Sequence, residues 1–309
     1  MKKLLVILTA LVVVGSSVFA LGGCGSDDKG SDATGTDGAG KVVIGSKSFT
    51  ENEILADIYQ FALEDKAGLE VERVQLASSA VNTALQNGEI DLYPEYTGTG
   101  LLDVLKTTAP SNDPQVVYDT VKDAYKTQFD IVWLDYAQAN DGQGIAVTKE
   151  ISDKYGITTI SDLQKNAKDI RFVSQGEFIE RSDGLPALVT VYGPFDFKKE
   201  LVIENALKYE TLLSGDGDAV VAYTTEGALT DPKFVLLEDD KLAWPPYNIA
   251  PVVRASVLES YPKIADVLNA VNAKIDTQTI TQLNAKVDVD KQEPDKVAKE
   301  FYDSIKDSL

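Results

Sequence analysis

The sequence predicts an α/β protein folded into two lobes joined by a hinge, on three observations. From Lys41 onward, short β-branched runs alternate with amphipathic stretches of helical period, a pattern typical of parallel-rich sheets covered by helices. About 270 residues follow position 40, which is more than a single core usually holds. Two junctions, 135–144 and 244–247, place polar, glycine or proline residues after apolar runs, as expected where a chain crosses between lobes.

The first part of this region reads as β-α-β-α-β. The sequence Thr50-Glu51-Asn52-Glu53 predicts a capping box, followed by a helix with its apolar positions on one face. A second helix, 80–86, is closed by Asn87-Gly88. The three strands around these helices are predicted at 42–44, 71–74 and 90–93.

The rest of the chain continues the alternation. Two C-terminal helices, 263–273 and 294–305, are expected to return to the first lobe. The predicted boundaries are 41–139 and 249–309 for lobe I, and 140–248 for lobe II. Further strands are predicted at 131–134, 144–148, 170–174, 208–210, 218–223, 234–237 and 249–253.

The N-terminus has the pattern of a bacterial lipoprotein signal. Lys2 and Lys3 precede an apolar run that ends in Leu21-Gly22-Gly23-Cys24, the only cysteine of the chain. We expect residues 1–23 to be removed, Cys24 to be lipidated, and 24–40 to form a flexible tether at the extracytoplasmic face of the cell membrane. The alternative is a chance cysteine beside an ordinary signal peptide.

Composition excludes several classes of function. The 49 acidic residues outnumber the 29 basic ones, which disfavours nucleic acid as a partner. The chain has no histidine, so the usual general base, the Ser-His-Asp triad and most transition-metal sites are missing. We therefore expect a protein without a metal, a cofactor or an enzymatic activity.

The segment from Gly88 to Gly100 is the best candidate for a binding edge. A strand is expected to stop at Pro94 and to place Tyr96 beside a Gly/Thr turn and a helix start. An aromatic face next to free backbone N–H groups attracts both a cation and an anion, which suits a zwitterion. Tyr223 and Tyr247 also lie near a strand end or hinge, so the three rings suggest a box. The alternative is that each is a packed core tyrosine.

Four motifs together resemble the glycine betaine/carnitine/choline-binding lipoproteins of osmoprotectant ABC importers. The resemblance implies a class II periplasmic-binding-protein fold, two lobes with two hinge crossings, and a ligand held between them. It also implies a monomer that delivers a quaternary-ammonium solute to an ABC permease and catalyses nothing. The motifs are residues 44–51, 88–100, 177–185 and 222–227.

The resemblance assigns roles to individual residues. Tyr96, Tyr223 and Tyr247 correspond to the box around the trimethylammonium group, where cation–π attraction contributes up to about 2 kcal/mol per desolvated face. Asp141 falls in the same ligand site. The residues that match those holding the ligand's carboxylate are Lys47, Thr99 and Arg181.

One position departs from the family pattern. Gln143 stands where a fourth box tyrosine is usual, which opens the box and makes it more polar. The ligand is then expected to be a bulkier or more polar betaine, such as carnitine or ergothioneine, unless Gln143 is a surface residue. Two other functions stay open: a ligand-sensing module on the same fold, and an enzyme whose general base the sequence does not reveal.

Overall fold

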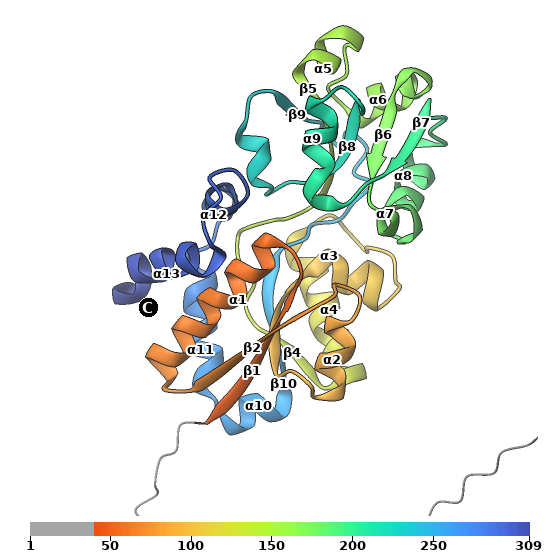
Figure 1. Ribbon diagram of the computed structural model, residues 1–309. Helices are drawn as coiled ribbons and strands as arrows, with labels where there is room; N and C mark the ends of the chain where they lie inside the picture. The colour runs from red at the N-terminus through yellow and green to blue at the C-terminus, as the bar shows by residue number, and fades with distance from the viewer. Residues whose placement is uncertain (1–39) are drawn as a thin grey trace, which may run out of the picture. The chain divides into compact units, whose positions relative to one another are not determined.

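The computed structural model describes residues 40–309. The predicted signal peptide, Cys24 and nearly all of the predicted tether lie outside the described residues. Over 40–309, no helix is both long and apolar enough to cross a membrane. This part of the chain contains two five-stranded sheets, each in its own lobe, so the predicted two-lobe α/β architecture is confirmed (Figure 1).

The first sheet has the strand order β2-β1-β3-β10-β4. β1 is parallel to β2 and β3, while β10 runs antiparallel to both of its neighbours. The antiparallel strand is thus the one that returns from the other lobe. The strands are β1 (Lys41–Lys47), β2 (Glu70–Leu76), β3 (Leu92–Tyr96), β4 (Ile131–Trp133) and β10 (Ile249–Arg254).

Helices pack around this sheet, except for α12, which packs against α1 and against the 227–230 turn of the second lobe. Helix α1 buries Ile54, Leu55 and Ile58, and its π-helical extension, 63–67, ends at Gly68 in the left-handed region. In Figure 1 the C-terminal helices lie beside α1. The helices are α1 (Thr50–Ala62), α2 (Val81–Asn87), α3 (Thr97–Thr99), a π-helical turn (Gly100–Val104), α4 (Pro114–Phe129), α10 (Ala255–Ser260), α11 (Lys263–Asn272), α12 (Thr277–Asp288) and α13 (Pro294–Ile305).

The second sheet repeats this plan with the order β7-β6-β8-β5-β9. β6 is parallel to β7 and β8, and β5, which enters directly from the first crossing, is antiparallel to β8 and β9. Its elements are β5 (Gln143–Thr148), α5 (Lys149–Tyr155), α6 (Ile160–Asn166), β6 (Arg171–Ser174), α7 (Gly176–Glu180), α8 (Leu185–Tyr192), β7 (Lys199–Val202), α9 (Lys208–Leu213), β8 (Ala219–Tyr223) and β9 (Phe234–Leu236).

The two crossings between the lobes lie side by side. Asn140 and Asn248 form an isolated antiparallel bridge, and the backbone N–H of Asp141 donates to the carbonyl of Tyr247 at 3.1 Å. The buried side chain of Asn248 donates to the carbonyls of Ala137 and Ala139 at 3.2 Å each. The crossings therefore support each other at the point where a hinge would bend.

Three local predictions are wrong. Thr50 does not cap α1: Phe49 is the N-cap without a side-chain bond, and the Thr50 hydroxyl donates to Asp288 Oδ1 at 2.6 Å. The predicted strand 208–210 is the start of helix α9. The third strand continues through Pro94, because Pro94 faces Pro251 and neither residue has an N–H to leave unpaired.

Candidate functional site

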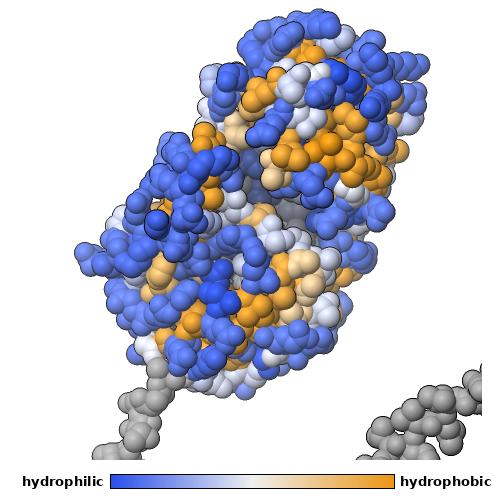
Figure 2. Space-filling model, in the orientation of Figure 1, coloured by the Kyte–Doolittle hydropathy of each residue, from blue (hydrophilic) through white to orange (hydrophobic). Residues whose placement is uncertain are grey.

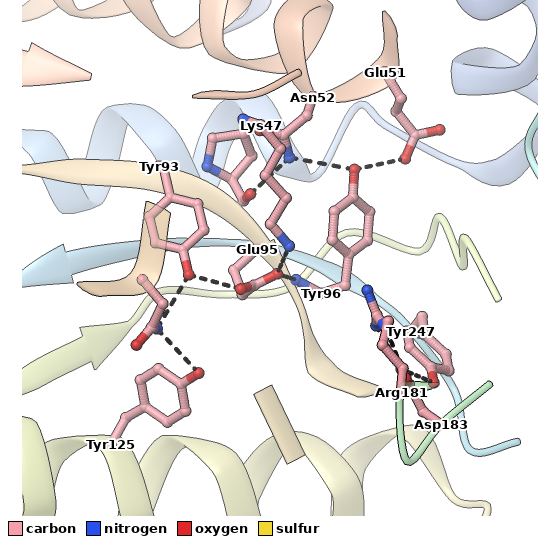
Figure 3. Close-up of polar contacts among 12 residues, drawn as sticks. Lys47, Glu51, Asn52, Tyr93, Glu95, Tyr96, Tyr125, Arg181, Asp183 and Tyr247 are labelled. Carbon is pink, nitrogen blue, oxygen red and sulfur yellow. Dashed lines mark hydrogen bonds and ion pairs between the residues drawn. The ribbon is translucent and has the colours of Figure 1, made fainter. Parts of the chain in front are cut away.

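Tyr96 ends strand β3 and is almost fully buried where the lobes meet. Its hydroxyl donates to Glu51 Oε1 at 3.0 Å and accepts from Asn52 Nδ2 at 3.4 Å (Figure 3). The ammonium of Lys47 lies 5.0 Å from the ring centroid. The phenol group is thus held at its tip by the start of α1, and the ring has a cation over one face.

Lys47 already has an internal partner. Its ammonium forms an ion pair with Glu95, which also accepts the hydroxyl hydrogen of Tyr93 at 2.6 Å. Both members of the ion pair are buried. Because a buried charge is stable only when it is paired, Glu95 accounts for the burial of Lys47 without any ligand. Its predicted contact with a ligand carboxylate stays a prediction.

Tyr247 and Arg181 meet at Asp183. The Arg181 guanidinium donates through Nε and Nη2 to the two Asp183 oxygens at 2.8 and 2.6 Å, and the Tyr247 hydroxyl donates to the same carboxylate at 2.9 Å. Burial alone would raise the pKa of Asp183, but the Arg181 guanidinium outweighs it and holds that pKa below its ordinary value. Asp183 therefore orients both predicted ligand contacts (Figure 3).

The ring of Tyr247 packs on the backbone of Gly98. A Cβ atom at Gly98 would lie 2.6 Å from three ring atoms, closer than side chains allow. Gly98 belongs to α3, directly after Tyr96, so the Gly/Thr turn of the first lobe is shaped around a ring from the second crossing. The half-exposed Thr99 is the next residue, and its hydroxyl makes no hydrogen bond to any described residue.

Gln143 and Tyr223 face each other on neighbouring strands. They are paired across β5 and β8, so their side chains project from the same face of the second sheet. Gln143 is only 7% exposed, and its Oε1 has no partner among the described residues. A buried acceptor without a donor costs on the order of 1–3 kcal/mol, so this amide oxygen is poised to accept from a donor that residues 40–309 do not supply.

Tyr223 is flanked by a second buried lysine. The ammonium of Lys208 lies 5.2 Å from the Tyr223 ring centroid and 5.3 Å from that of Tyr209. Lys208 forms an ion pair with Glu226, which also accepts the Tyr209 hydroxyl hydrogen. The second lobe thus repeats the arrangement of Lys47, Glu95, Tyr93 and Tyr96 in the first. We call each set a Lys-Glu-Tyr-Tyr quartet.

Asp141 lies in a cluster of carboxyl groups that joins the two lobes. The Thr225 hydroxyl lies 2.6 Å from both Asp141 Oδ1 and Glu51 Oε2, and Asn284 Nδ2 donates to that Glu51 oxygen at 2.8 Å. Burial raises the pKa of Glu51, and burial together with the Glu51 charge raises that of Asp141 well above its usual range.

The predicted site residues come together in part. Burial raises the pKa of Tyr96 and of Tyr223, and negative charges add to the rise: Glu51 and then Asp141 at Tyr96, and Glu226 and then Asp141 at Tyr223. The Arg181 guanidinium opposes this rise at Tyr223. Residues 40–309 therefore bring three tyrosines, Arg181, Asp141 and Gln143 toward the meeting point of the lobes. Figure 2 shows a hollow in the surface between the two lobes.

Sequence reasoning missed four supporting residues: Glu51, Asp183, Lys208 and Thr225. Glu51 looked like part of a helix cap, and Lys208 fell in a segment predicted as a strand. The signal that could have found Thr225 and Asp183 was their place inside two of the quoted motifs, 222–227 and 177–185.

Comparison with known proteins places this geometry in a family. The family model described as the substrate binding domain of ABC-type glycine betaine transport system matches residues 40–304. The glycine betaine-binding protein YehZ of Escherichia coli is 33% identical over 275 residues, covering 85% of this chain and 90% of YehZ.

Two further similarities agree with this family assignment. The ergothioneine transport permease/ergothioneine binding protein EgtU of Helicobacter pylori is 30% identical over 267 residues; the match covers 85% of this chain but only 47% of EgtU, about half its length. A crystal structure of a glycine betaine/carnitine/choline ABC transporter has a TM-score of 0.72 at 30% identity, covering 85% of this chain and 98% of that one. The class II periplasmic-binding-protein fold is thereby confirmed, and the chain belongs to the family of substrate-binding domains of ABC-type glycine betaine transport systems.

Proposed function

We propose that this chain captures a betaine that carries a hydrogen-bond donor besides its trimethylammonium and carboxylate groups, and delivers it to an ABC permease. The observation that carries the proposal is the buried, unpartnered Oε1 of Gln143 opposite Tyr223. Glycine betaine has no N–H or O–H to donate, so that oxygen would stay unpaired beside it. Carnitine has a hydroxyl group and ergothioneine has a ring N–H.

The charged ends of such a ligand find complementary groups. The rings of Tyr96, Tyr223 and Tyr247 would surround the trimethylammonium group. Arg181 Nη1 is not used in the pair with Asp183, so it is available to a carboxylate while Nε and Nη2 stay fixed. The Thr99 hydroxyl, which makes no hydrogen bond within residues 40–309, would add a second contact to the carboxylate. The ammonium of Lys47 would add a third contact from its place beside Glu95.

The proposal is tested by calorimetric titration with glycine betaine, carnitine, choline and ergothioneine. We expect a donor-bearing betaine to bind below about 100 µM, or roughly −5.5 kcal/mol, and more tightly than glycine betaine. Gln143→Leu should remove that preference, whereas Gln86→Leu, at an exposed glutamine of α2, should keep it. If no compound binds below about 100 µM, or glycine betaine binds best, the proposal is wrong.

We extend the proposal to the rest of the chain. Cys24 would anchor the protein through a lipid at the extracytoplasmic face, and the monomer would act without catalysis, with lobes bounded at 140–248 and 41–139 plus 249–309. The support is the signal pattern before Cys24 and the family of the folded region. Cys24→Ser should release the protein from membranes, detected by fractionation of the producing cells.

A further inference from the structure

The Thr225 hydroxyl group makes two short contacts but cannot donate a hydrogen in both. It lies 2.6 Å from Glu51 Oε2 and 2.6 Å from Asp141 Oδ1. A hydroxyl group has one hydrogen to donate, and an ionised carboxylate has none. One of the two short contacts must therefore be donated by a carboxyl group, so either Glu51 or Asp141 is protonated.

The position of this pair gives it a role beyond packing. Glu51 belongs to α1 of the first lobe, Asp141 to the first crossing, and Thr225 to the loop after β8 of the second lobe. Glu51 also accepts the hydroxyl hydrogen of Tyr96 at 3.0 Å. The carboxyl pair thus touches the tyrosine box at its phenol tip and joins three parts of the chain at once.

We infer that Glu51 and Asp141 share a single proton, supply one negative charge beside the tyrosine box, and release that proton when the cationic head of a ligand enters. This inference rests on the proposed function, because a trimethylammonium group is the cation concerned. A positive charge close to the pair favours its doubly ionised form. Ligand affinity should therefore rise with pH.

The surroundings of the pair agree with one retained proton. The groups that contact Glu51 are neutral donors, Tyr96, Asn284 and Thr225, besides Asp141 itself. The next titratable groups around the pair are Glu226, of the same sign, and the phenols of Tyr209 and Tyr223. The nearby ammonium groups of Lys47 and Lys208 are each neutralised by a glutamate. Two full charges would thus lie close together in a buried place without a cation of their own.

Glu51 acts as a positioning residue for the tyrosine box. It fixes the Tyr96 phenol group, and through Thr225 it connects that ring to the lobe that supplies Tyr223. An amide at either position would keep one fixed donor and one carboxylate, but would have no proton to release. The two amide variants therefore separate the proton link from the packing of the pair.

The experiment measures the proton exchange of binding directly. The tightest betaine of the four-compound panel is titrated by calorimetry between about pH 5 and pH 8, in two buffers with different ionisation enthalpies. Neither glycine betaine nor carnitine has a group that titrates in this range. For the unmodified protein we expect release of up to one proton and an affinity that rises by up to about tenfold per pH unit.

The variants make the test specific. Glu51→Gln and Asp141→Asn should each abolish the proton release. The ratio of the affinity of the unmodified protein to that of each variant should therefore rise by up to about tenfold per pH unit. Glu53→Gln, two residues along α1 and outside the pair, should keep both the release and the slope. A flat profile without release in the unmodified protein would overturn the inference, as would unchanged release in Glu51→Gln.

A second measurement needs no ligand and separates this inference from the proposed function. Infrared spectroscopy of the ligand-free protein at neutral pH should show one protonated carboxyl group that Glu51→Gln or Asp141→Asn removes. If that signal is present and no betaine binds, the proposed function is wrong and the shared proton stands. If betaines bind and the signal is absent, the shared proton is wrong and the proposed function stands.

Discussion

Tyr247 of the second crossing donates its hydroxyl hydrogen to Asp183 of the second lobe at 2.9 Å. Asp183 is fully buried and also holds the Arg181 guanidinium through two bonds. The contact links a ring proposed for the cationic head to a guanidinium proposed for the carboxylate. The two ends of the ligand site therefore share one orienting group.

The ring and the hydroxyl of Tyr247 are predicted to contribute unequally. Tyr247→Ala should weaken binding of a quaternary ammonium by roughly tenfold to thirtyfold, because a desolvated cation–π contact contributes up to about 2 kcal/mol. Tyr247→Phe should lose much less, since Asp183 keeps both bonds from Arg181. Calorimetry on both variants decides the matter. Equal losses would mean that the hydroxyl, and not the ring, supports binding.

Gly98 should tolerate no side chain. A Cβ atom there would lie 2.6 Å from the Tyr247 ring, so Gly98→Ala must displace the ring or the turn. We expect affinity to fall about tenfold or more, with a destabilisation of about 1–3 kcal/mol in denaturant unfolding. Gly176→Ala is the control, because its Cβ would meet only Val202 at an ordinary 3.8 Å. An unchanged affinity in Gly98→Ala would show that Tyr247 does not contact the ligand.

Gln143 is predicted to set the ranking of ligands. Gln143→Tyr replaces the unpartnered amide by an aromatic face and should shift preference toward glycine betaine, which has no donor for an amide oxygen to accept. The ratio of the dissociation constants of glycine betaine and carnitine, before and after substitution, is the measurement. An unchanged ratio would show that Gln143 does not touch the ligand.

The pair of Glu51 and Asp141 should also make stability depend on pH. Folding raises the pKa of both carboxyl groups, so their contribution to stability is fully present below the ordinary pKa of about 4 and is lost as pH rises through the raised values. The free energy of unfolding should fall by up to about 1.4 kcal/mol per pH unit over that window.

Denaturant unfolding between about pH 5 and pH 8 checks this dependence. Glu51→Gln should give a shallower profile, since the remaining Asp141 carboxylate then has no shared proton to lose. Other carboxyl groups with raised pKa, such as Asp57 and Asp288, titrate in both proteins, so the difference between the two profiles isolates the pair. Parallel profiles would contradict the prediction.

Most strands could be predicted because β-branched runs such as 42–44 and 249–253 have few alternatives to a buried strand. The segment 208–210 could not, because three residues fit either structure and the partner of the buried Lys208, Glu226, lies eighteen positions away. The edge strand β7 was missed because most of its side chains are exposed and show no apolar alternation.

The tyrosines of the site could be predicted from the sequence, but the residues that orient them could not. Tyrosines at strand ends can be recognised along the chain, and Tyr96 and Tyr223 do end β3 and β8. The partners that orient them cannot, because Glu51 reaches Thr225 over 174 positions and Tyr247 reaches Asp183 over 64. Burial of a charged residue depends on such distant partners, and no local pattern encodes them.

The two Lys-Glu-Tyr-Tyr quartets have a consequence for how the site can change. Each lobe carries its own neutral quartet, with the lysine, the glutamate and the rings already in place. Parting the lobes would break neither of the two ion pairs, so opening of the empty receptor leaves no quartet lysine or glutamate without its partner. The aromatic walls are also in place without a ligand, and preorganisation of this kind lowers the entropy lost on capture. A descendant of this protein could therefore acquire a new solute by replacing one residue between the quartets, such as Gln143, and leave both walls as they are.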